Sequence, residues 1–354
     1  MLHFRLKIVN IKLFRVAGKQ ERQIGNMSVI DRFKDKVRGR NLCVVLPEGN
    51  DERIIQAARR IADEGIAKPI VLGKAEQIKA AEQKAGVKLD GIEIIDPRES
   101  GGLEAYAEKY IEGRDDLPLA VAKRMVAKPL FYGGMMVKCG DADTMVGGIA
   151  NATATVIQAG TLTIGMAAGI STASSFFLMV IPDFMGEKDK PFIYADCAVN
   201  IAPTPEQLAD IALASAISGR KLLGVEPCVA MLSFSTKGSA SHQDVDKVLA
   251  ALKIAKDRAP NLAIDGELQA DAAIIPGVAA KKVKSESAVA GKANVLIFPD
   301  LNSGNIAYKL TQYMANAKAI GPFLQGFAIP ISDLSRGANA DDVVAAAAIC
   351  LAQL

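Results

Sequence analysis

The residues best suited to chemistry lie near the end of this 354-residue chain, in the segment ISDLSRGANADD at 331–342. Ser335 offers a hydroxyl, Arg336 a planar guanidinium that stays charged, and Gly337 a flexible backbone. The carboxylates of Asp341 and Asp342 follow after a short loop. Such groups can bind an anion and accept a proton, whereas a closing surface helix needs none of them. The segment therefore predicts a site.

Three other polar loops follow predicted strands in the same half of the chain: SFSTKGSASH (233–242), DGELQAD (265–271) and PDLNSGN (299–305). Ligands of open parallel sheets bind beyond the carboxyl ends of the strands, where backbone N–H groups and helix N-termini can approach an anion. Ordinary turn chemistry also favours Ser, Asn, Asp and Gly, so one such loop alone has a structural explanation. Four of them in one half of the chain favour an anionic ligand.

Several common sites lack their sequence signatures. No GxxxxGK[ST] occurs, and no GxGxxG follows a strand, which argues against a P-loop and a Rossmann dinucleotide site. The chain has only two histidines, His3 and His242, so a Ser-His-Asp triad would depend on His242, in a polar loop without a nucleophile elbow. The chemistry is therefore expected to depend on carboxylates, arginines, hydroxyls and backbone dipoles.

The cysteines give no sign of a metal site. They are five in number and far apart, at 43, 139, 197, 228 and 350, mostly within apolar runs such as LCVVL and AICLA. No CxxC or Cys/His pairing suggests zinc. This pattern predicts reduced, buried thiols in a cytoplasmic protein.

Strand-like and helix-like stretches alternate from residue 41 onward, which is typical of an α/β protein with mainly parallel sheets. The predicted strands are 41–49, 68–73, 92–97, 144–148, 174–182, 191–199, 228–236, 262–268 and 294–301. The stretches at 174–182 and 191–199 could pair across a turn-rich segment. We expect a first domain from 27–170 plus 325–354, and a second from 171–324.

The first 26 residues differ from the rest in charge. They contain six basic residues and one acid, so the remaining chain carries a net charge of about −2 although the whole carries +3. We predict that residues 1–26 are an extension outside the fold, and that an amphipathic helix begins just after Met27. With no Trp and six Tyr, the body of the chain gives no indication of nucleic-acid binding. No run reaches the ~18 apolar residues of a membrane span.

Five segments, in this order and spacing, resemble the phosphotransacetylase (phosphate acetyltransferase) family: SFSTKGSA, IDGELQADAA, VAGKANVLIFPDLNSGNIAYKL, GPFLQG and ISDLSRGA. The resemblance extends from about Met27 to the end. It implies two α/β/α domains of the isocitrate/isopropylmalate dehydrogenase-like type with an active-site cleft between them. It also implies reversible acyl transfer between coenzyme A and phosphate, with acetyl-CoA and acetyl phosphate as substrates. No metal, other cofactor or covalent acyl-enzyme is expected, and a homodimer is usual.

The resemblance also implies roles for the opening segment. Ser335 and Arg336 match the residues that bind the phosphoryl end and polarise the acyl carbonyl. Asp342, six residues past the arginine, matches the general base for the CoA thiol. A carboxylate pair could instead serve the N-terminus of a helix, a task that asks for only one acid. Both roles can hold, with Asp341 as the capping-type residue.

Five further residues are substrate-binding candidates through the resemblance. Asn151 and Thr153 lie in a small polar run, and Asn305 and Lys309 in the NSGNIAYK block, at ligand-facing positions of the family. Arg114 matches by spacing an arginine that the family directs towards CoA.

One departure affects the choice of acyl group. Family members commonly carry an arginine shortly after the hydroxyl run, where this chain has Gln158. Acetyl, propionyl and butyryl transfer therefore all stay open. Two other functions compete with catalysis of acyl transfer. A dehydrogenase of the same fold class would need a metal-binding carboxylate cluster and a nicotinamide loop, and neither is evident. A non-catalytic acyl-CoA sensor normally follows a malic-enzyme region, and here the DLSRG motif is intact.

Overall fold

A computed structural model describes residues 28–354, so the predicted extension at 1–26 lies outside the described residues. The first element is helix α2 (Val29–Val37), which confirms the amphipathic helix expected after Met27. Ser28 caps it, and its side chain accepts a hydrogen bond from the Asp31 backbone. The buried side chains of Phe33 and Val37 face the core.

The first sheet has five strands, all paired in parallel. Their order is β11 (Ile331–Asp333), β4 (Thr144–Gly147), β1 (Cys43–Leu46), β2 (Lys68–Leu72) and β3 (Glu93–Ile95). Successive side chains of a strand point to opposite faces. Accordingly, Val44 and Leu46 belong to one core and Val45 to another. Both faces are buried, as expected for a parallel sheet.

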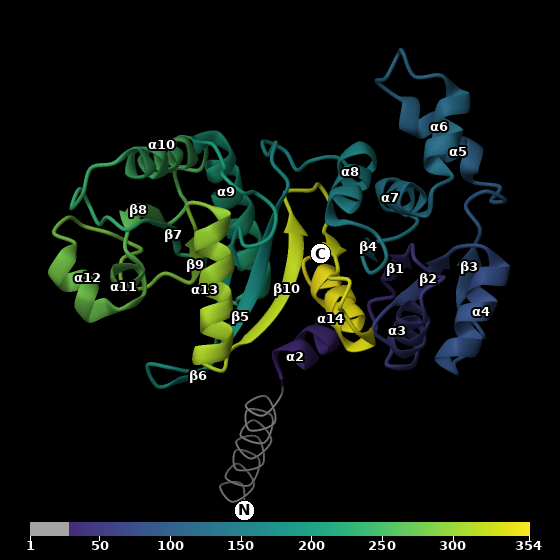
Figure 1. Cartoon of the computed structure of the whole chain (residues 1–354), viewed down its shortest axis with the longest axis horizontal. Helices are drawn as coiled ribbons and strands as arrows, with labels where there is room; N and C mark the ends of the chain where they lie inside the picture. The colour runs from purple at the N-terminus through teal and green to yellow at the C-terminus, as the bar shows by residue number, and fades with distance from the viewer. Residues whose placement is uncertain (1–27) are drawn as a thin grey trace, which may run out of the picture.

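Helices cover both faces of this sheet (Figure 1). One layer holds α2, α3 (Glu52–Asp63), α4 (Ala75–Ala85) and α14 (Ala340–Leu351). The other holds α5 (Leu103–Ile111), α6 (Leu119–Val126), α7 (Pro129–Cys139) and α8 (Thr153–Thr163). The result is an α/β/α sandwich, with α3 beginning just after β1 and α8 shortly after β4.

The second sheet has six strands and is mixed. Its order is β10 (Lys318–Gln325), β5 (Ser174–Phe184), β6 (Glu187–Ala195), β9 (Val295–Ile297), β7 (Val229–Leu232) and β8 (Ile264–Leu268). The predicted pairing of β5 with β6 is confirmed as an antiparallel hairpin. Helices α9 (Pro205–Leu222) and α10 (Gln243–Arg258) cover one face; α11 (Ala270–Ile274), α12 (Pro276–Lys282) and α13 (Leu301–Met314) cover the other. This second α/β/α sandwich confirms the predicted two-domain α/β fold.

Two strands were not predicted from the sequence. Strand β10 contains Gly321-Pro322, where its pairing with β5 shifts register. A proline is tolerated there because β10 is an edge strand. Strand β11 has only 3 residues, too few to show a period. The chain returns to the first sheet between Gln325 and Ile331, and the domain limits at 170 and 325 stay a prediction.

Some predicted boundaries and burials are wrong. Strand β7 ends at Leu232 rather than at 236, because the polar residues that follow form a loop. All five cysteines are free thiols, as predicted, but only Cys197 and Cys350 are buried. Cys139 is exposed because it ends helix α7 at the surface, between Lys138 and Gly140.

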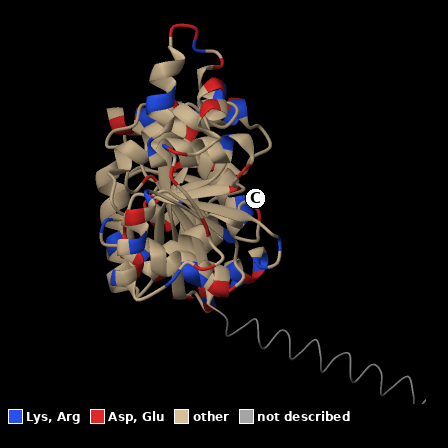
Figure 2. Ribbon diagram, turned by 90° about the vertical axis from the view of Figure 1, so that its right-hand side faces the viewer, with Lys and Arg blue, Asp and Glu red and all other residues tan. Residues whose placement is uncertain are grey.

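Charged residues of both signs are distributed over the fold. In Figure 2 the blue and red residues are interspersed on the face in view, and much of the central sheet is tan. Among residues 28–354, no helix has both the length and the apolar character needed to cross a membrane.

Candidate active site at the junction of the two sheets

The Ser335–Arg336–Gly337 loop connects strand β11 to helix α14. Its three residues are exposed, whereas the strand residues before it are buried. The Leu334 backbone N–H donates to the Gly147 carbonyl at 2.7 Å, which extends the β11–β4 pairing to the start of the loop. The Gly337 N–H donates to the Ser335 hydroxyl at 3.3 Å. The loop thus begins from a rigid strand at the carboxyl edge of a parallel sheet, where ligands commonly bind.

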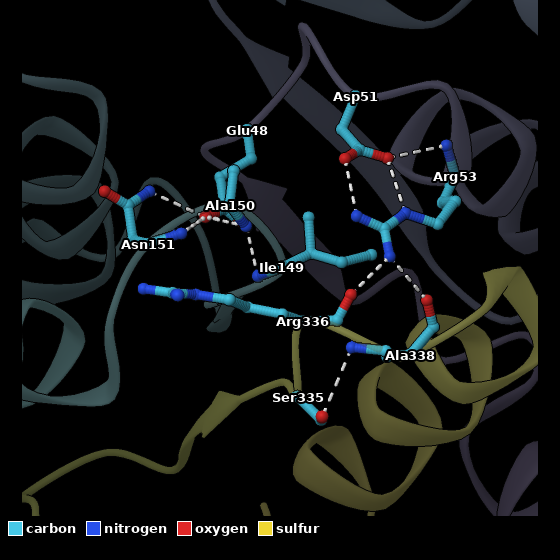
Figure 3. A network of polar contacts seen from close by, with 10 residues as sticks. Glu48, Asp51, Arg53, Ile149, Ala150, Asn151, Ser335, Arg336 and Ala338 are labelled. Atoms are coloured by element: carbon cyan, nitrogen blue, oxygen red, sulfur yellow. Dashed lines mark hydrogen bonds and ion pairs between the residues drawn. The ribbon is translucent and has the colours of Figure 1, made fainter.

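Arg53, in the first turn of α3, holds the backbone of this loop (Figure 3). Its Nη1 donates to the carbonyl oxygens of Arg336 at 2.7 Å and Ala338 at 2.9 Å. Its Nε and Nη2 donate to the two Asp51 oxygens at 2.9 and 2.8 Å. The hydrogen bond from Arg53 lowers the pKa of Asp51, so that carboxylate stays charged at neutral pH. The pair fixes the loop backbone, and the Arg336 side chain extends toward Asn151.

Glu48 shapes the segment that the Arg336 side chain faces. This buried carboxylate lies just beyond β1 and is 3% exposed. It accepts hydrogen bonds from the backbone N–H groups of Ile149, Ala150 and Asn151, each at 2.9 Å, and from the Asn151 amide at 2.6 Å. A buried charge is tolerable when it is this well paired. Glu48 therefore determines where Asn151 lies.

Asp333 connects the same segment to the Ser335–Arg336–Gly337 loop. The Thr153 hydroxyl, at the first residue of α8, donates to Asp333 Oδ2 at 2.5 Å. Asp333 is 3% exposed, and this burial raises the pKa of its carboxyl to about 6. Because Asp333 ends β11, the hydrogen bond joins the start of α8 to the strand that leads into Ser335.

Asp342 lies in the first turn of α14 and belongs to its cap. Asn339 is the N-cap: its side chain accepts from the Asp342 N–H at 3.1 Å, and Asp342 Oδ2 accepts from the Asn339 N–H at 2.9 Å. This reciprocal pair is a capping box. The expectation that Asp341 is the capping-type residue is therefore wrong. Asp341 instead pairs with Arg60 at 2.5 Å, because it faces α3.

A cavity of about 320 Å³ places the loop and the helix start on one surface. Ser335, Asp341 and Asp342 line it from the first sheet's side, and residues 319–323 of β10 line it from the second sheet. The cavity therefore lies where the two sandwiches meet. A carboxylate from the first turn of α14 and the hydroxyl of Ser335, just beyond β11, share it.

The other predicted residues lie elsewhere. Asn305 and Lys309 are on α13, which packs on the second sheet. The Asn305 amide donates to the Cys197 carbonyl at 3.1 Å, and Lys309 Nζ lies 5.0 Å from the Tyr308 ring centre. Contact with Tyr308 raises the pKa of Lys309.

Arg114 is also separate from the loop. Its guanidinium lies 4.2 Å from the Tyr110 ring centre and donates to the Leu162 carbonyl at 2.7 Å. Leu162 is at the far end of α8 from Thr153, so roughly 14 Å of helix separates them. The structure brings Ser335, Arg336, Asp342, Asn151 and Thr153 into one region, and leaves Arg114, Asn305 and Lys309 around it.

Four residues of this region were not predicted: Glu48, Asp51, Arg53 and Asp333. Three of them lie in PEGNDER (47–53), which directly follows strand β1. Charged residues beyond the carboxyl end of a parallel strand are a usable signal of a site, but the predicted site loops all lay in the second half of the chain. Asp333 lies within the ISDLS segment itself, but its burial could not be inferred there.

Comparison with known proteins identifies the family of this chain. The family model described as Phosphate acetyl/butaryl transferase matches residues 28–351. The chain belongs to this family. A phosphate acetyltransferase of Acetivibrio thermocellus is 45% identical over 92% of this chain and 98% of its own length. That of Bacillus subtilis is 41% identical over 90% of this chain and 97% of its own.

Solved structures agree. A phosphotransacetylase from Streptococcus pyogenes superposes with a TM-score of 0.84 at 41% identity, covering 92% of this chain and 99% of that one. EutD phosphotransacetylase from Staphylococcus aureus gives 0.83 at 38% identity, covering 92% and 98%. The predicted resemblance is confirmed, and the chain is an acyltransferase of this family with its two-domain α/β fold.

Proposed function

We propose that this acyltransferase moves an acetyl group reversibly between coenzyme A and inorganic phosphate, in a ternary complex. The names of the relatives support the substrates. The observation that carries the proposal is the site geometry: Ser335 and Asp342 share one cavity, and Arg53 holds the backbone of the loop that presents Arg336. Such an arrangement can bind an acyl phosphate and activate a thiol next to it.

Asp342 would act as the general base. A thiol with a pKa near ~8.5 is mostly protonated at neutral pH, so a positioned carboxylate increases the thiolate fraction during attack. Asp342 Oδ2 accepts from Asn339, so the thiol proton would pass to Oδ1. The CoA sulfur then bonds to the acetyl carbon, and the carbon–oxygen bond to the phosphoryl group breaks. Phosphate leaves with that electron pair.

Ser335 and Arg336 would bind the groups that carry charge during this step. The guanidinium fork fits two phosphoryl oxygens and remains charged at any working pH. The Ser335 hydroxyl can donate to the carbonyl oxygen as it becomes an oxyanion. Donors placed in advance of the reaction lower such a barrier by roughly 3–4 kcal/mol. Asn151 and Thr153, at the start of α8, face the same region and would contact the substrates.

The peripheral candidates suit a long substrate. Coenzyme A carries phosphates and a nucleotide at the end remote from its thiol, so cations outside the reacting centre are useful. We assign the cations of Arg114 and Lys309 to this role, and the neutral Asn305 amide to a hydrogen bond with the same substrate. Gln158 is exposed on α8, where the family commonly has a cation. Propionyl or butyryl transfer is therefore the alternative within the same chemistry.

Three further expectations complete the proposal: the enzyme works without added metal, as a homodimer, in the cytoplasm. The residues described in the structure include no group of three or more His, Cys, Asp or Glu side chains arranged to hold a metal ion. Rates measured before and after exhaustive EDTA treatment test the first expectation. Loss of activity that only a metal restores would contradict it.

The central test measures steady-state rates with acetyl-, propionyl- and butyryl-CoA plus phosphate, followed by the free thiol released. We expect acetyl-CoA to give the highest kcat/KM. A higher value for butyryl-CoA would establish the alternative acyl group. No thiol release with any of them, together with measurable acyl-CoA binding, would indicate the non-catalytic sensor. Reduction of NADP with a 2-hydroxy acid and Mg²⁺ would indicate the dehydrogenase.

A further inference from the structure

Asp333 is a buried carboxylate with an incomplete set of partners. Its Oδ2 accepts the Thr153 hydroxyl at 2.5 Å, but its Oδ1 is buried and has no hydrogen-bond partner among residues 28–354. Gly148 packs directly on it: a methyl group added there would lie 2.0 Å from Oδ1. Gly148 also has φ of +99°, which favours glycine. The surrounding backbone is therefore shaped around this carboxylate.

The other buried carboxylates near the two sheet edges are better satisfied. Glu48 accepts four N–H groups. Asp196, also 3% exposed, accepts from the Ser175 hydroxyl, from three backbone N–H groups and from the Asn200 amide. A buried polar atom without a partner costs stability and calls for an explanation. Stability alone does not account for an aspartate at 333.

The position of Asp333 offers that explanation. It pairs with Gly147 across β11 and β4, so its backbone is fixed by the sheet. Ser335 follows two residues later in the chain. The Asp333 side chain itself accepts a hydrogen bond from Thr153, the first residue of α8. The carboxylate thus connects both halves of the proposed site: the loop of Ser335 and Arg336, and the α8 start with Asn151 and Thr153.

We propose that Asp333 is a positioning residue for the acyl-transfer site, which sets the spacing between the α8 start and the Ser335–Arg336 loop and directs the Thr153 hydroxyl. This inference rests on the proposed function. Because the Thr153 hydroxyl donates to Asp333, the oxygen of that hydroxyl remains available to accept a hydrogen bond from a substrate group. Replacing the carboxylate with an amide keeps its volume but weakens the acceptor and allows an N–H to face Thr153 instead.

The test compares Asp333→Asn, Thr153→Val, the double variant and Thr153→Ser with the wild type, at pH 7.5 and with phosphate and acetyl-CoA varied separately. Misplacement of reacting groups by about 1 Å can cost on the order of 100-fold in rate. We expect Asp333→Asn to lower kcat/KM by about 10- to 100-fold. Thr153→Ser, which keeps the hydroxyl, should lose less of kcat/KM than Thr153→Val, which removes it. The double variant should be no worse than the poorer single variant, because both remove one bond.

Thr144→Val is the matched control. The Thr144 hydroxyl is also buried, and it donates to the Pro330 carbonyl at 2.7 Å, so it joins β4 to the residue before β11. This bond lies at the other end of the same strand pair and touches neither part of the site. Its loss should lower Tm by a few degrees with kcat and KM within twofold of wild type. Asp333→Asn should instead lower kcat/KM while its Tm at pH 7.5 is no lower than that of the wild type.

Asp333→Asn with unchanged kinetics and a lower Tm would overturn the inference, since that is the result of a structural residue. Fully additive losses for the double variant would overturn it too. If Asp333→Asn fails to fold, Thr153→Val and Thr153→Ser test the same bond from its other side, and equal losses for both would reject the hydroxyl's role. A wild type that releases no thiol from any acyl-CoA would instead reject the proposed function, and this inference with it.

Discussion

Two regions of this molecule contain the same kinds of residue but use them differently. In the first sandwich, buried Glu48 and Arg53 bind backbone groups, and the side chains of Ser335 and Arg336 remain exposed. In the second, the polar loops 233–242 and 265–271 bind each other. Buried Glu267 accepts from the Ser235 hydroxyl at 2.8 Å and the Gly238 N–H at 2.7 Å. Residue type alone does not distinguish a site from a well-satisfied loop.

Charged side chains of the second region also pair with one another. Lys237 Nζ donates to Asp265 at 2.6 Å and to the Gly266 carbonyl at 2.8 Å, and the Ser287 hydroxyl donates to the same aspartate at 2.6 Å. These contacts satisfy polar groups of the loops from which an anion-binding site was predicted. The comparison predicts that substitutions in the first region change rates, whereas those in the second change stability.

The largest effect is expected from Asp342→Asn. The amide can still accept from the Asn339 N–H, so the cap is retained while the base is lost. We expect kcat to fall by roughly 10²–10⁴-fold with little change in the KM for CoA. Raising the pH should partly restore the rate, because hydroxide then supplies thiolate. Stopped-time thiol assays across pH measure this, and kcat within twofold of wild type at neutral pH would remove Asp342 from the mechanism.

Asp341→Asn is the control for that substitution. The two aspartates are adjacent, but Asp341 pairs with Arg60 on the exposed side of α14. Loss of an exposed ion pair costs less than about 1 kcal/mol, so both rate and stability should stay near wild type. A large loss of rate in Asp341→Asn would mean that Asp341, and not Asp342, is the general base.

The next effect concerns Asp333 and pH. Its folded-state pKa of about 6 exceeds the ordinary 3.8, so the folded protein binds this proton more tightly than the unfolded chain. The ionised carboxylate therefore destabilises the fold above pH 6, and this cost disappears as the pH falls towards 4. As the pH rises from 4 to above 6, the wild type should therefore lose up to ~3 kcal/mol of unfolding free energy relative to Asp333→Asn. Urea unfolding of both proteins from pH 4 to 8 checks this, and parallel pH profiles would contradict it.

Lys237→Met tests the second region. It removes the nearer cation from Asp265, which is 6% exposed, while Lys256 remains 3.6 Å away. We expect a loss of about 1–3 kcal/mol of unfolding free energy, the usual cost of leaving a buried charged group short of a partner. The kcat should stay within twofold. Urea midpoints and thiol-release rates measure both, and a tenfold lower kcat at unchanged stability would break the comparison.

The smallest effect is expected from Gln158→Arg. The residue is exposed on α8, and an exposed ion pair contributes less than about 1 kcal/mol. We therefore expect a change of about two- to fivefold in the ratio of kcat/KM for acetyl-CoA to that for butyryl-CoA, with Tm unchanged. Parallel assays with both acyl-CoAs measure the ratio, and Gln158→Lys separates charge from guanidinium geometry. An identical ratio in all three proteins would show that this position does not select the acyl group.

The sequence by itself determined what depends on neighbouring residues. Strands β1 and β2, the β5–β6 hairpin and the amphipathic α2 each follow from a local pattern of apolar residues and turns. Ser335, Arg336 and Asp342 could be recognised together because one short loop holds all three. The motif order was enough to identify the family.

Only the tertiary structure decided what those residues face. Arg53 meets the Arg336 carbonyl across 283 residues of sequence, and Thr153 meets Asp333 across 180. Burial of Asp333 depends on β4 and α8 packing over a strand too short to predict. Likewise, the partner of Asp341 depends on how α3 packs beside α14, since that packing brings Arg60 to it. Pairing between distant segments sets these contacts, because no local pattern specifies which partner a charged side chain will meet.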